Sequence, residues 1–322
     1  MTDRPVYLMS PPRLDWALRG KANFRSQTAE PVNAARARAE WAQLADAIVA
    51  GGGEVIVCPP SPIRNLTGLV YTAEAGEFYR GSDGEPRFLL ANMAVQHRHE
   101  ESDWIGGFME GLGVRTRTVR AKWEAQGDVL RALHGTRVVH TFGSGKYRRT
   151  EARAYEEVAH RIGGRHIQIA FRADPWFHGN TFLNFYEGAE LAPRLGEEKS
   201  RIPTVTLVCP DALVPGELER LGRFLPEAEI VQLTTEESLG YDTNCLQVGS
   251  TVIGSTSMSD KAEHVFRGLG LDIVKLDLAE LFLKGGGAPV CLTNRLWEAG
   301  ASEFPDHARW SKHPSIEHHT RL

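Results

Sequence analysis

The sequence has no excess of charge of one sign and no long hydrophobic run. Its 37 basic and 41 acidic residues leave a formal net charge of −4, so it offers no strong basic field for a nucleic-acid backbone. No apolar stretch approaches the roughly 20 residues that span a bilayer, and the first dozen residues lack the apolar core of a signal peptide. We therefore expect a cytoplasmic protein that binds neither nucleic acid nor membrane. Whether it forms a homo-oligomer is left open.

The sequence is also poor in cysteine and lacks two common nucleotide-binding motifs. Its four cysteines are far apart, form no CxxC pair and have no zinc-site spacing. In a reducing compartment such residues are usually free thiols, buried as small hydrophobic side chains. No GxGxxG follows the first predicted strand, and no GxxxxGK[ST] occurs. The cysteines are Cys58, Cys209, Cys245 and Cys291.

What is present is a repeated helix-to-strand unit in a chain of ordinary globular composition, with 42% hydrophobic and 24% charged residues. In each unit, apolar residues recur every three to four positions, a Gly or Pro ends the pattern, and a short β-branched run follows. The predicted strands of the five units end at Cys58, Val119, Phe171, Leu233 and Asp277.

Five units in 322 residues correspond to about 64 residues each. A unit of this size, with one helix and several strands, is too small to bury its own core, so the repeats suggest a ring or an array. The alternative is an open doubly wound sheet, which the missing nucleotide motifs disfavour.

A glycine-rich segment precedes the last cysteine. Gly285, Gly286 and Gly287 cost backbone entropy, so they indicate a tight turn or a close approach to a ligand. Cys291 follows four residues later. On spacing alone, a turn before an ordinary buried cysteine is the simpler interpretation.

Two other segments carry groups suited to catalysis. Glu124 and Asp128 flank Gly127 at a predicted strand-to-turn boundary, where a solvated Gly-Asp turn is the ordinary interpretation. His178 lies in an aromatic run, where a half-buried structural histidine is more common than a base. A cysteine, a histidine and acids on separate strands are nevertheless the parts of a nucleophilic site.

Taken in order, these motifs resemble the guanidino-group-modifying enzymes, which include arginine deiminase, dimethylargininase, arginine dihydrolase and the amidinotransferases. The resemblance extends over about residues 6–297, with similar segments at MSPP near the start, at Tyr71–Phe78 and around Arg149. The motifs are Glu124-x-x-Gly127-Asp128, His178-Gly179-Asn180-Thr181 and Gly285-Gly286-Gly287-x-x-x-Cys291-Leu292-Thr293.

The resemblance implies a pentein fold, which is an α/β structure: a five-bladed α/β propeller of ββαβ repeats around a channel that holds the active site. We therefore expect a single pentein catalytic domain over residues 1–300 and a polar C-terminal extension over residues 301–322. The extension contains four histidines, and a flexible, exposed end is favoured over a metal site.

The resemblance also implies catalytic roles. Cys291 would be the nucleophile, because a thiolate can attack the poorly electrophilic guanidinium carbon and form an S-alkylthiouronium. His178 would protonate the leaving amine and then activate the incoming water or amine. Glu124 and Asp128 would hold the guanidinium through charged hydrogen bonds. No metal and no other cofactor is implied.

Further substrate-binding residues follow from the same resemblance. Glu74 falls where related hydrolases place an acid against the guanidinium. Arg149 falls where some members bind a substrate carboxylate. Asn180 and Asn244 complete the predicted substrate-binding set.

Three positions depart from the family pattern. Asn180 replaces a frequent Asp, Thr67-Gly68 replaces a Pro-Asp pair, and Asn92 replaces a frequent Arg. The lost acids weaken the case for a fully charged guanidinium, and the lost Arg weakens the case for a free α-amino acid. Asparagine here is also compatible with dihydrolase-type members.

The expected activity is hydrolysis of a guanidino C–N bond in a small arginine-like molecule. An amidinotransferase, which shares the cysteine and the histidine, is the alternative; the APVCLTN context is more similar to the hydrolases. Non-catalytic ribosome-binding proteins of the same fold form a third class. Retention of Cys291 and His178 argues against that class.

Overall fold

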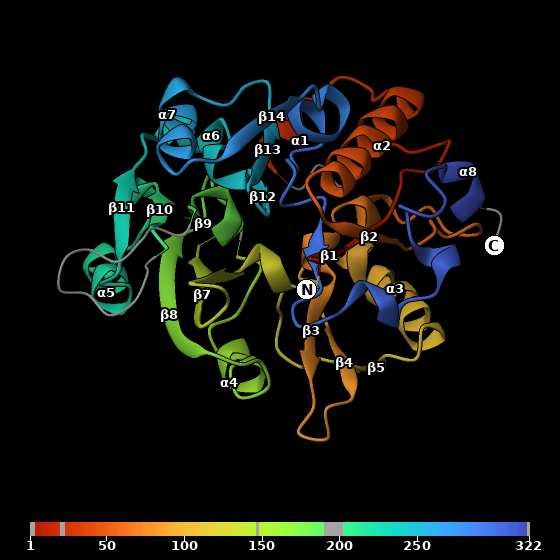
Figure 1. Cartoon of the computed structure of the whole chain (residues 1–322), viewed down its shortest axis with the longest axis horizontal. Helices are drawn as coiled ribbons and strands as arrows, with labels where there is room; N and C mark the ends of the chain where they lie inside the picture. Colours follow the sequence, from red (N-terminus) through yellow and green to blue (C-terminus); the bar gives the residue numbers. More distant parts are fainter. Residues whose placement is uncertain (1–3, 20–22, 146–147, 190–201, 321–322) are drawn as a thin grey trace.

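The computed structural model describes residues 4–19, 23–145, 148–189 and 202–320. In this part of the chain the strands form five three-stranded sheets around a common centre, and one helix of each repeat lies on the outside (Figure 1). This five-bladed α/β arrangement confirms the predicted ring of repeats and excludes the open doubly wound sheet. The outer helices are α2 (Ala34–Ala50), α3 (His99–Gly111), α4 (Ala154–Val158), α5 (Glu217–Phe224) and α7 (Asp260–Gly268).

The second to fifth sheets are built in the same order along the chain. Two consecutive strands pair antiparallel, an outer helix follows, and the third strand pairs parallel with the middle one. The strands are β3 (Gly76–Arg80), β4 (Pro86–Leu90) and β5 (Arg115–Thr118); β6 (Val129–Ala132), β7 (Arg137–Ser144) and β8 (Arg165–Arg172); β9 (Leu183–Glu187), β10 (Thr204–Val208) and β11 (Ala228–Gln232); and β12 (Leu246–Val248), β13 (Thr251–Ser255) and β14 (Asp272–Leu276).

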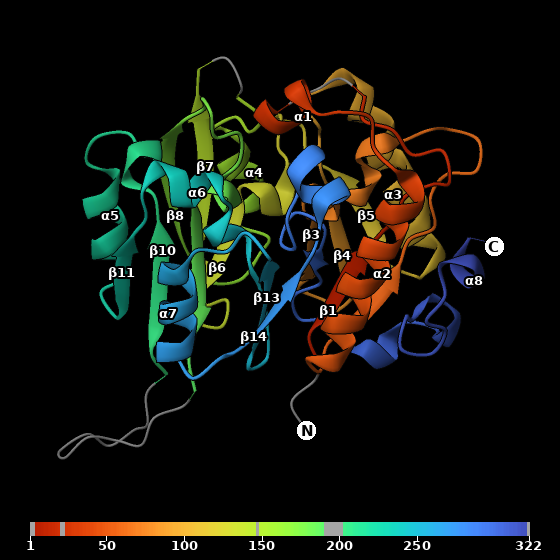
Figure 2. The ribbon, with the colours of Figure 1, turned by 90° about the horizontal axis from the view of Figure 1, so that it is seen from above.

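The first sheet joins two segments that are far apart in the sequence. β1 (Val6–Met9) pairs parallel with β2 (Glu54–Val57) and antiparallel with β15 (Asn294–Arg295). The ring is thus closed by backbone hydrogen bonds between β1 and the strand that follows Cys291. Figure 2 shows the ring from above, with α2 and α3 on one side and α5 and α7 on the other.

The longest outer helix, α2, illustrates why each unit folds as it does. The side chain of Asn33 caps its first turn by accepting a hydrogen bond from Arg36 N, and Gly52, with φ of +91°, reverses the chain after its end. The buried stripe packs against β2 and comprises Trp41, Leu44, Ala45 and Ile48. None of the described helices combines the length and apolarity needed to cross a membrane.

The third predicted helix is much shorter in the structure than its sequence pattern indicates. The segment before α4 is bound elsewhere: Glu151 N donates to Lys122 O, and the Thr150 hydroxyl donates to Asp128. These bonds fix the backbone ahead of Arg153 outside the helix. Three further short helices lie outside the repeat: α1 (Phe24–Thr28), α6 (Thr235–Leu239) and α8 (Ile316–His319).

The prediction of a flexible, exposed C-terminal end is wrong for residues 301–320. Trp310 is 2% exposed, packs edge-on against Trp41 with ring centroids 5.2 Å apart, and donates its backbone N–H to Val55 O. Ile316 and His319 are also buried. The apolar residues scattered through the polar tail explain the difference, because they cover the outer side of the first blade. The division of the chain at residue 300 stays a prediction.

Candidate active site

Cys291 lies in a turn between the glycine-rich segment and β15. A Cβ atom on Gly285 or Gly287 would overlap the Tyr71 ring, and Gly286 has a φ of +88°. Only glycine lets the backbone pass this close to Tyr71 in this conformation. The three glycines therefore let the backbone bring Cys291 to its place in the site.

Two asparagines hold the cysteine. Cys291 N donates to Asn244 Oδ1 at 3.1 Å, and Cys291 Sγ lies 3.7 Å from Asn180 Oδ1. Asn244 Nδ2 in turn donates to Asn180 O at 3.0 Å. Burial raises the pKa of the Cys291 thiol to about 12, although the hydrogen bond from the Asn244 side chain opposes this shift. This shift favours the protonated thiol at neutral pH.

His178 lies between two buried carboxylates. Its Nε2 is 2.7 Å from Glu124 Oε2, within hydrogen-bond distance. Its Nδ1 is 3.2 Å from Glu74 Oε1, but the angle does not form a hydrogen bond. A Cβ atom on Gly127 would come within 3.0 Å of the imidazole ring, so the glycine between Glu124 and Asp128 makes room for His178.

Glu124 is fully buried and remains charged. Burial raises its pKa, but Arg149 and then His178 more than offset that effect and hold the pKa below its ordinary value. Arg149 Nη1 lies 3.5 Å from Glu124 Oε2. Glu124 Oε1 accepts a hydrogen bond from Ala94 N at 2.9 Å. Glu124 thus orients the imidazole from behind the pocket.

Asp128 occupies a different position from the one that the sequence comparison implies. Its Oδ1 accepts hydrogen bonds from the Thr141 hydroxyl and from Gly179 N, and its Oδ2 accepts one from Thr150. These donors occupy the carboxylate, which is 1% exposed. The geometry favours a positioning role, in which Asp128 fixes the backbone next to His178, over direct contact with a guanidinium.

Arg98 is the site residue that the sequence analysis missed. Its guanidinium forms ion pairs with Glu74 and with Glu101, and it donates to Gly68 O at 3.0 Å. A Cβ atom on Gly68 would overlap Arg98, so this glycine admits the side chain to the site. The sequence feature that could have pointed to Arg98 was Gly68, which stands where the family pattern has a Pro-Asp pair.

Asn92, by contrast, lies outside the site. Its Nδ2 donates to Arg120 O, and its Oδ1 accepts a hydrogen bond from Lys122 Nζ at 2.9 Å. Because both ends of the amide bind neighbouring backbone and side-chain groups, Asn92 acts in the fold. This chain thus has Asn92 where the family pattern has an arginine, and it has a different arginine, Arg98, in the pocket.

The predicted residues meet at one narrow pocket of about 60 Å³. Cys291, His178, Glu74 and Arg149 line it, together with the unpredicted Arg98. Glu124, Asp128, Asn180 and Asn244 are buried and hold these lining residues from behind. The remaining lining residues are Leu18, Arg19, Asn23, Ser26, Thr67, Gly68, Tyr71, His97, Phe177, Gly285, Gly286 and Gly287.

The same cluster offers the donor atoms of a metal site. One ligand atom each from Glu74, Glu124 and His178 lies within 4.8 Å of the others. Each carboxylate, however, already faces a guanidinium, since Glu74 pairs with Arg98 and Glu124 with Arg149. Two fixed positive charges oppose the binding of another cation. The arrangement suits a histidine oriented by acids better than a metal ion.

The sequence matches no protein-family model, and no curated protein is significantly similar. Solved structures do match. The N-terminal domain of ArgZ, a cyanobacterial arginine dihydrolase, superimposes with a TM-score of 0.75 and 18% identity, over 91% of this chain and 98% of that chain. AgrE in complex with L-arginine matches with a TM-score of 0.73 and 22% identity, over 94% of this chain and 41% of that chain.

A dimethylarginine dimethylaminohydrolase matches less closely, with a TM-score of 0.58 and 15% identity, over 91% of this chain and 99% of that chain. At these identities the likeness concerns the fold. The chain therefore has the five-bladed α/β propeller, or pentein, fold of these guanidino-modifying enzymes.

Proposed function

We propose that this protein is a cysteine-dependent hydrolase of a guanidino C–N bond in a small arginine-like molecule. The observation that supports this most directly is the common pocket of Cys291 and His178, with the imidazole held between Glu74 and Glu124. The arginine dihydrolase and dimethylarginine hydrolase of the same fold act on such bonds.

In the first step Cys291 Sγ attacks the guanidinium carbon. The thiol proton passes to His178, and a cationic guanidinium placed beside the sulfur stabilises the resulting thiolate. The bond from carbon to one nitrogen then breaks, and that nitrogen leaves as a neutral amine or ammonia with a proton from His178. An S-alkylthiouronium remains on Cys291. The pocket-facing Nδ1 of His178, which forms no hydrogen bond to the described residues, is placed for this proton transfer.

In the second step water replaces the sulfur. His178, now neutral, takes a proton from water as the oxygen attacks the thiouronium carbon. Collapse of the adduct breaks the C–S bond, the sulfur takes the hydroxyl proton as the thiol re-forms, and the ureido product is released. His178 then gives the proton that it took from water to the solvent. Glu124 stabilises the charged imidazolium in each half-reaction because it remains ionised beside Nε2. In one relative, a covalent reaction intermediate has been captured crystallographically.

The charges around the pocket indicate what else the substrate carries. Arg19, Arg98 and Arg149 line the pocket, whereas Glu74 is its one lining carboxylate among the described residues. Arg98 and Arg149 pair with Glu74 and Glu124, whereas no ion pair joins Arg19 to the described residues, so Arg19 is available to an anionic group of the substrate. We therefore expect a substrate that also bears a carboxylate.

The nucleophile is tested by Cys291→Ser. We expect turnover to fall by roughly 10³-fold or more, because a neutral hydroxyl is a much weaker nucleophile than a thiolate. The circular dichroism spectrum should not change, since the hydrogen bond to Asn244 comes from the backbone. Cys209→Ser, far from the pocket, is the matched control. Turnover at the wild-type rate in Cys291→Ser would refute the proposal.

Product analysis separates hydrolysis from amidino transfer. Arginine, methylated and acylated arginines, agmatine and guanidino acids are incubated singly, and ammonia, amines and ureido products are measured. A ureido product formed with water alone supports the hydrolase. Turnover that depends on an added amine such as glycine or ornithine would identify an amidinotransferase instead.

A further inference from the structure

A second, larger cavity of about 330 Å³ adjoins the nucleophile from the other side. Cys291 lines the active-site pocket, whereas its neighbours Val290 and Thr293 line this cavity. Asn180, whose Oδ1 lies 3.7 Å from Cys291 Sγ, also lines it. The walls come from β1, β6, β9, β12 and β15, the inner strands of four blades. We call this space the far cavity.

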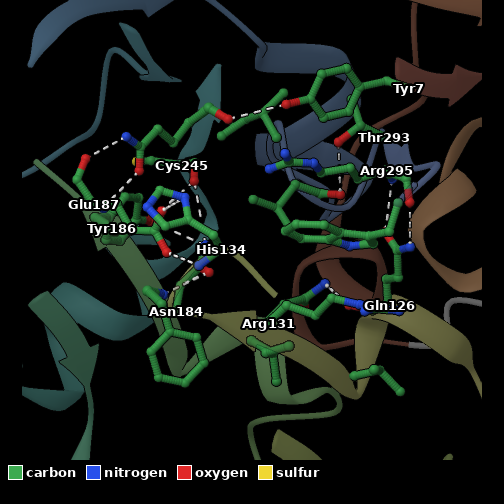
Figure 3. A pocket seen from close by; sticks show the side chains of 18 of the residues that line it. Tyr7, Gln126, Arg131, His134, Asn184, Tyr186, Glu187, Cys245, Thr293 and Arg295 are labelled. Carbon is green, nitrogen blue, oxygen red and sulfur yellow. Dashed lines mark hydrogen bonds and ion pairs between the residues drawn. The ribbon is translucent and has the colours of Figure 1, made fainter. Parts of the chain in front are cut away.

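Two walls of the far cavity carry its charged groups. Figure 3 shows Arg295 and Tyr7 on one side and His134, Glu187 and Asn184 on the other. His134 Nδ1 pairs with Glu187 Oε2 at 2.5 Å. Glu187 is the one carboxylate among the described lining residues, and both of its oxygens already contact His134, one the ring and one the backbone N–H.

The opposite wall has two arginines, and one of them has a carboxylate partner. Arg131 forms a buried ion pair with Glu77, with Nη2 2.5 Å from Oε1. Arg295 has no such partner: within residues 4–19, 23–145, 148–189 and 202–320, no side chain forms an ion pair or hydrogen bond with its guanidinium. The far cavity therefore holds one guanidinium whose N–H groups have no acceptor among the described residues.

Arg295 is held in place although its charged group is free. Its backbone N–H donates to Gln126 Oε1 and its carbonyl accepts from Gln126 Nε2, both at 2.8 Å. Its guanidinium stacks on the Trp297 ring, 3.8 Å from the centroid. Stacking fixes the guanidinium plane and leaves its N–H edge to the cavity, which lowers the entropy lost when an anion binds.

We propose that the far cavity is a second ligand site, which takes a small carboxylate through Arg295. A planar carboxylate matches the paired N–H donors of a guanidinium. A carboxylate also brings a single negative charge, whereas a phosphate dianion would bring two beside Glu187. The cavity volume admits a metabolite with a few further polar groups, for which Asn184, Gln247 and Tyr7 line the walls.

The test is isothermal titration calorimetry with succinate on the full-length protein. Arg295→Gln should weaken binding by about tenfold or more, because a charge-assisted paired contact is lost. Arg295→Lys keeps the charge but not the paired donors and should retain part of the affinity. Arg19→Gln, which removes an exposed arginine from the active-site pocket, distinguishes the two pockets, because it should not change the affinity of the far cavity. The matched control is Arg117→Gln, at an exposed position of β5.

Several outcomes would overturn the proposal. Undetectable succinate binding to the wild type would do so, as would equal affinity in Arg295→Gln. A loss in Arg19→Gln alone would move the carboxylate to the active-site pocket, and tighter binding of inorganic phosphate than of succinate would contradict the carboxylate assignment. Thermal melting of each variant separates loss of a ligand contact from loss of fold. Because no arm measures turnover, the result is independent of the proposed hydrolase activity.

Discussion

At the residue scale, the site is organised by pairs of opposite charge. Glu74 faces Arg98, Glu124 faces Arg149, and His178 lies between the two acids. Both acids therefore lie beside the imidazole, and Arg149 keeps Glu124 ionised. The buried thiol of Cys291 forms no ion pair with the described residues, so its reactivity should depend on the charge that a ligand brings.

This dependence predicts selective alkylation. Chloroacetamidine and chloroacetamide have nearly the same shape, but only the amidine is cationic. We expect chloroacetamidine to modify Cys291 at least roughly tenfold faster than chloroacetamide does, because a positive charge beside the sulfur favours the thiolate. Peptide mass mapping after brief exposure gives the rates.

The other cysteines serve as internal controls for this measurement. Cys58, Cys209 and Cys245 are buried, and burial raises the pKa of each. They should react slowly with both reagents. Equal rates of the two reagents at Cys291, or faster labelling elsewhere, would contradict the assignment of Cys291 as nucleophile.

Arg98 gives a prediction about stability. Arg98→Ala leaves Glu74 and Glu101 buried without their shared cation, and removal of one partner from a buried ion pair costs about 3–5 kcal/mol. Urea denaturation measures the change in the free energy of unfolding. Arg117→Ala, on an exposed position of β5, is the control and should change it by no more than about 0.5 kcal/mol. A similar small change in Arg98→Ala would show that the network is dispensable.

Arg98 also marks where sequence reasoning reached its limit. Cys291 and His178 could be identified as site residues from the sequence because glycines lie near them and because their motifs follow the order of the family. Arg98 and Glu101 are three residues apart at a helix start and have the pattern of an ordinary surface pair. Glu74 and Gly68 belong to a different segment of the sequence, and only the folded chain brings them into contact with Arg98.

At the element scale, the outer helices and the strands after them could be predicted, whereas several inner strands could not. The helices have a clear apolar stripe and a glycine or proline stop. β3, β6, β9 and β12 are short and include polar side chains: Arg131, Asn184 and Gln247 line the far cavity, and Glu77 pairs with Arg131. Their mixed composition hides the alternation that identifies a half-buried strand.

The third blade contains a histidine pair that predicts pH-dependent stability. His140 Nε2 lies 2.9 Å from His166 Nδ1 between β7 and β8. Burial, and then His166, lowers the pKa of His140 to about 3. In the unfolded chain, the His140 imidazole takes up a proton near pH 6.5. The neutral histidine pair therefore contributes its full stabilisation above that pH, and the free energy of unfolding falls as the pH drops from 6.5 towards 3.

Urea denaturation at several pH values between 4 and 8, as an order-of-magnitude range around the imidazole pKa, tests this expectation. His140→Gln removes the titrating group and should flatten the slope below pH 6.5. His160→Gln, on an exposed position after α4, is the control and should leave the slope unchanged. An identical slope in His140→Gln and the wild type would assign the pH dependence to other groups.

At the scale of the whole molecule, the chain beyond β15 stabilises the first blade. Trp310 contacts Trp41 and donates its indole N–H to Asp46 Oδ1 at 2.7 Å. Arg309 and Ser311 donate hydrogen bonds to buried Glu54 in β2. The tail therefore covers the outer layer of the ring.

Trp310→Ala should lower the free energy of unfolding by about 3–5 kcal/mol, as expected for a large buried aromatic side chain. Leu14→Ala, at a position that is 81% exposed, should change it by no more than about 0.5 kcal/mol. Thermal or urea denaturation compares the two. A small effect of Trp310→Ala would mean that the tail contributes little to the stability of the ring.

The pairing of β1 with β15 has a consequence for the synthesis of the protein. β1 is synthesised before the other four blades, but its partner strand, and the cysteine just before it, are synthesised only after them. The first blade therefore keeps an open edge until Cys291 has been added. Catalytic competence and completion of the circle should arrive together.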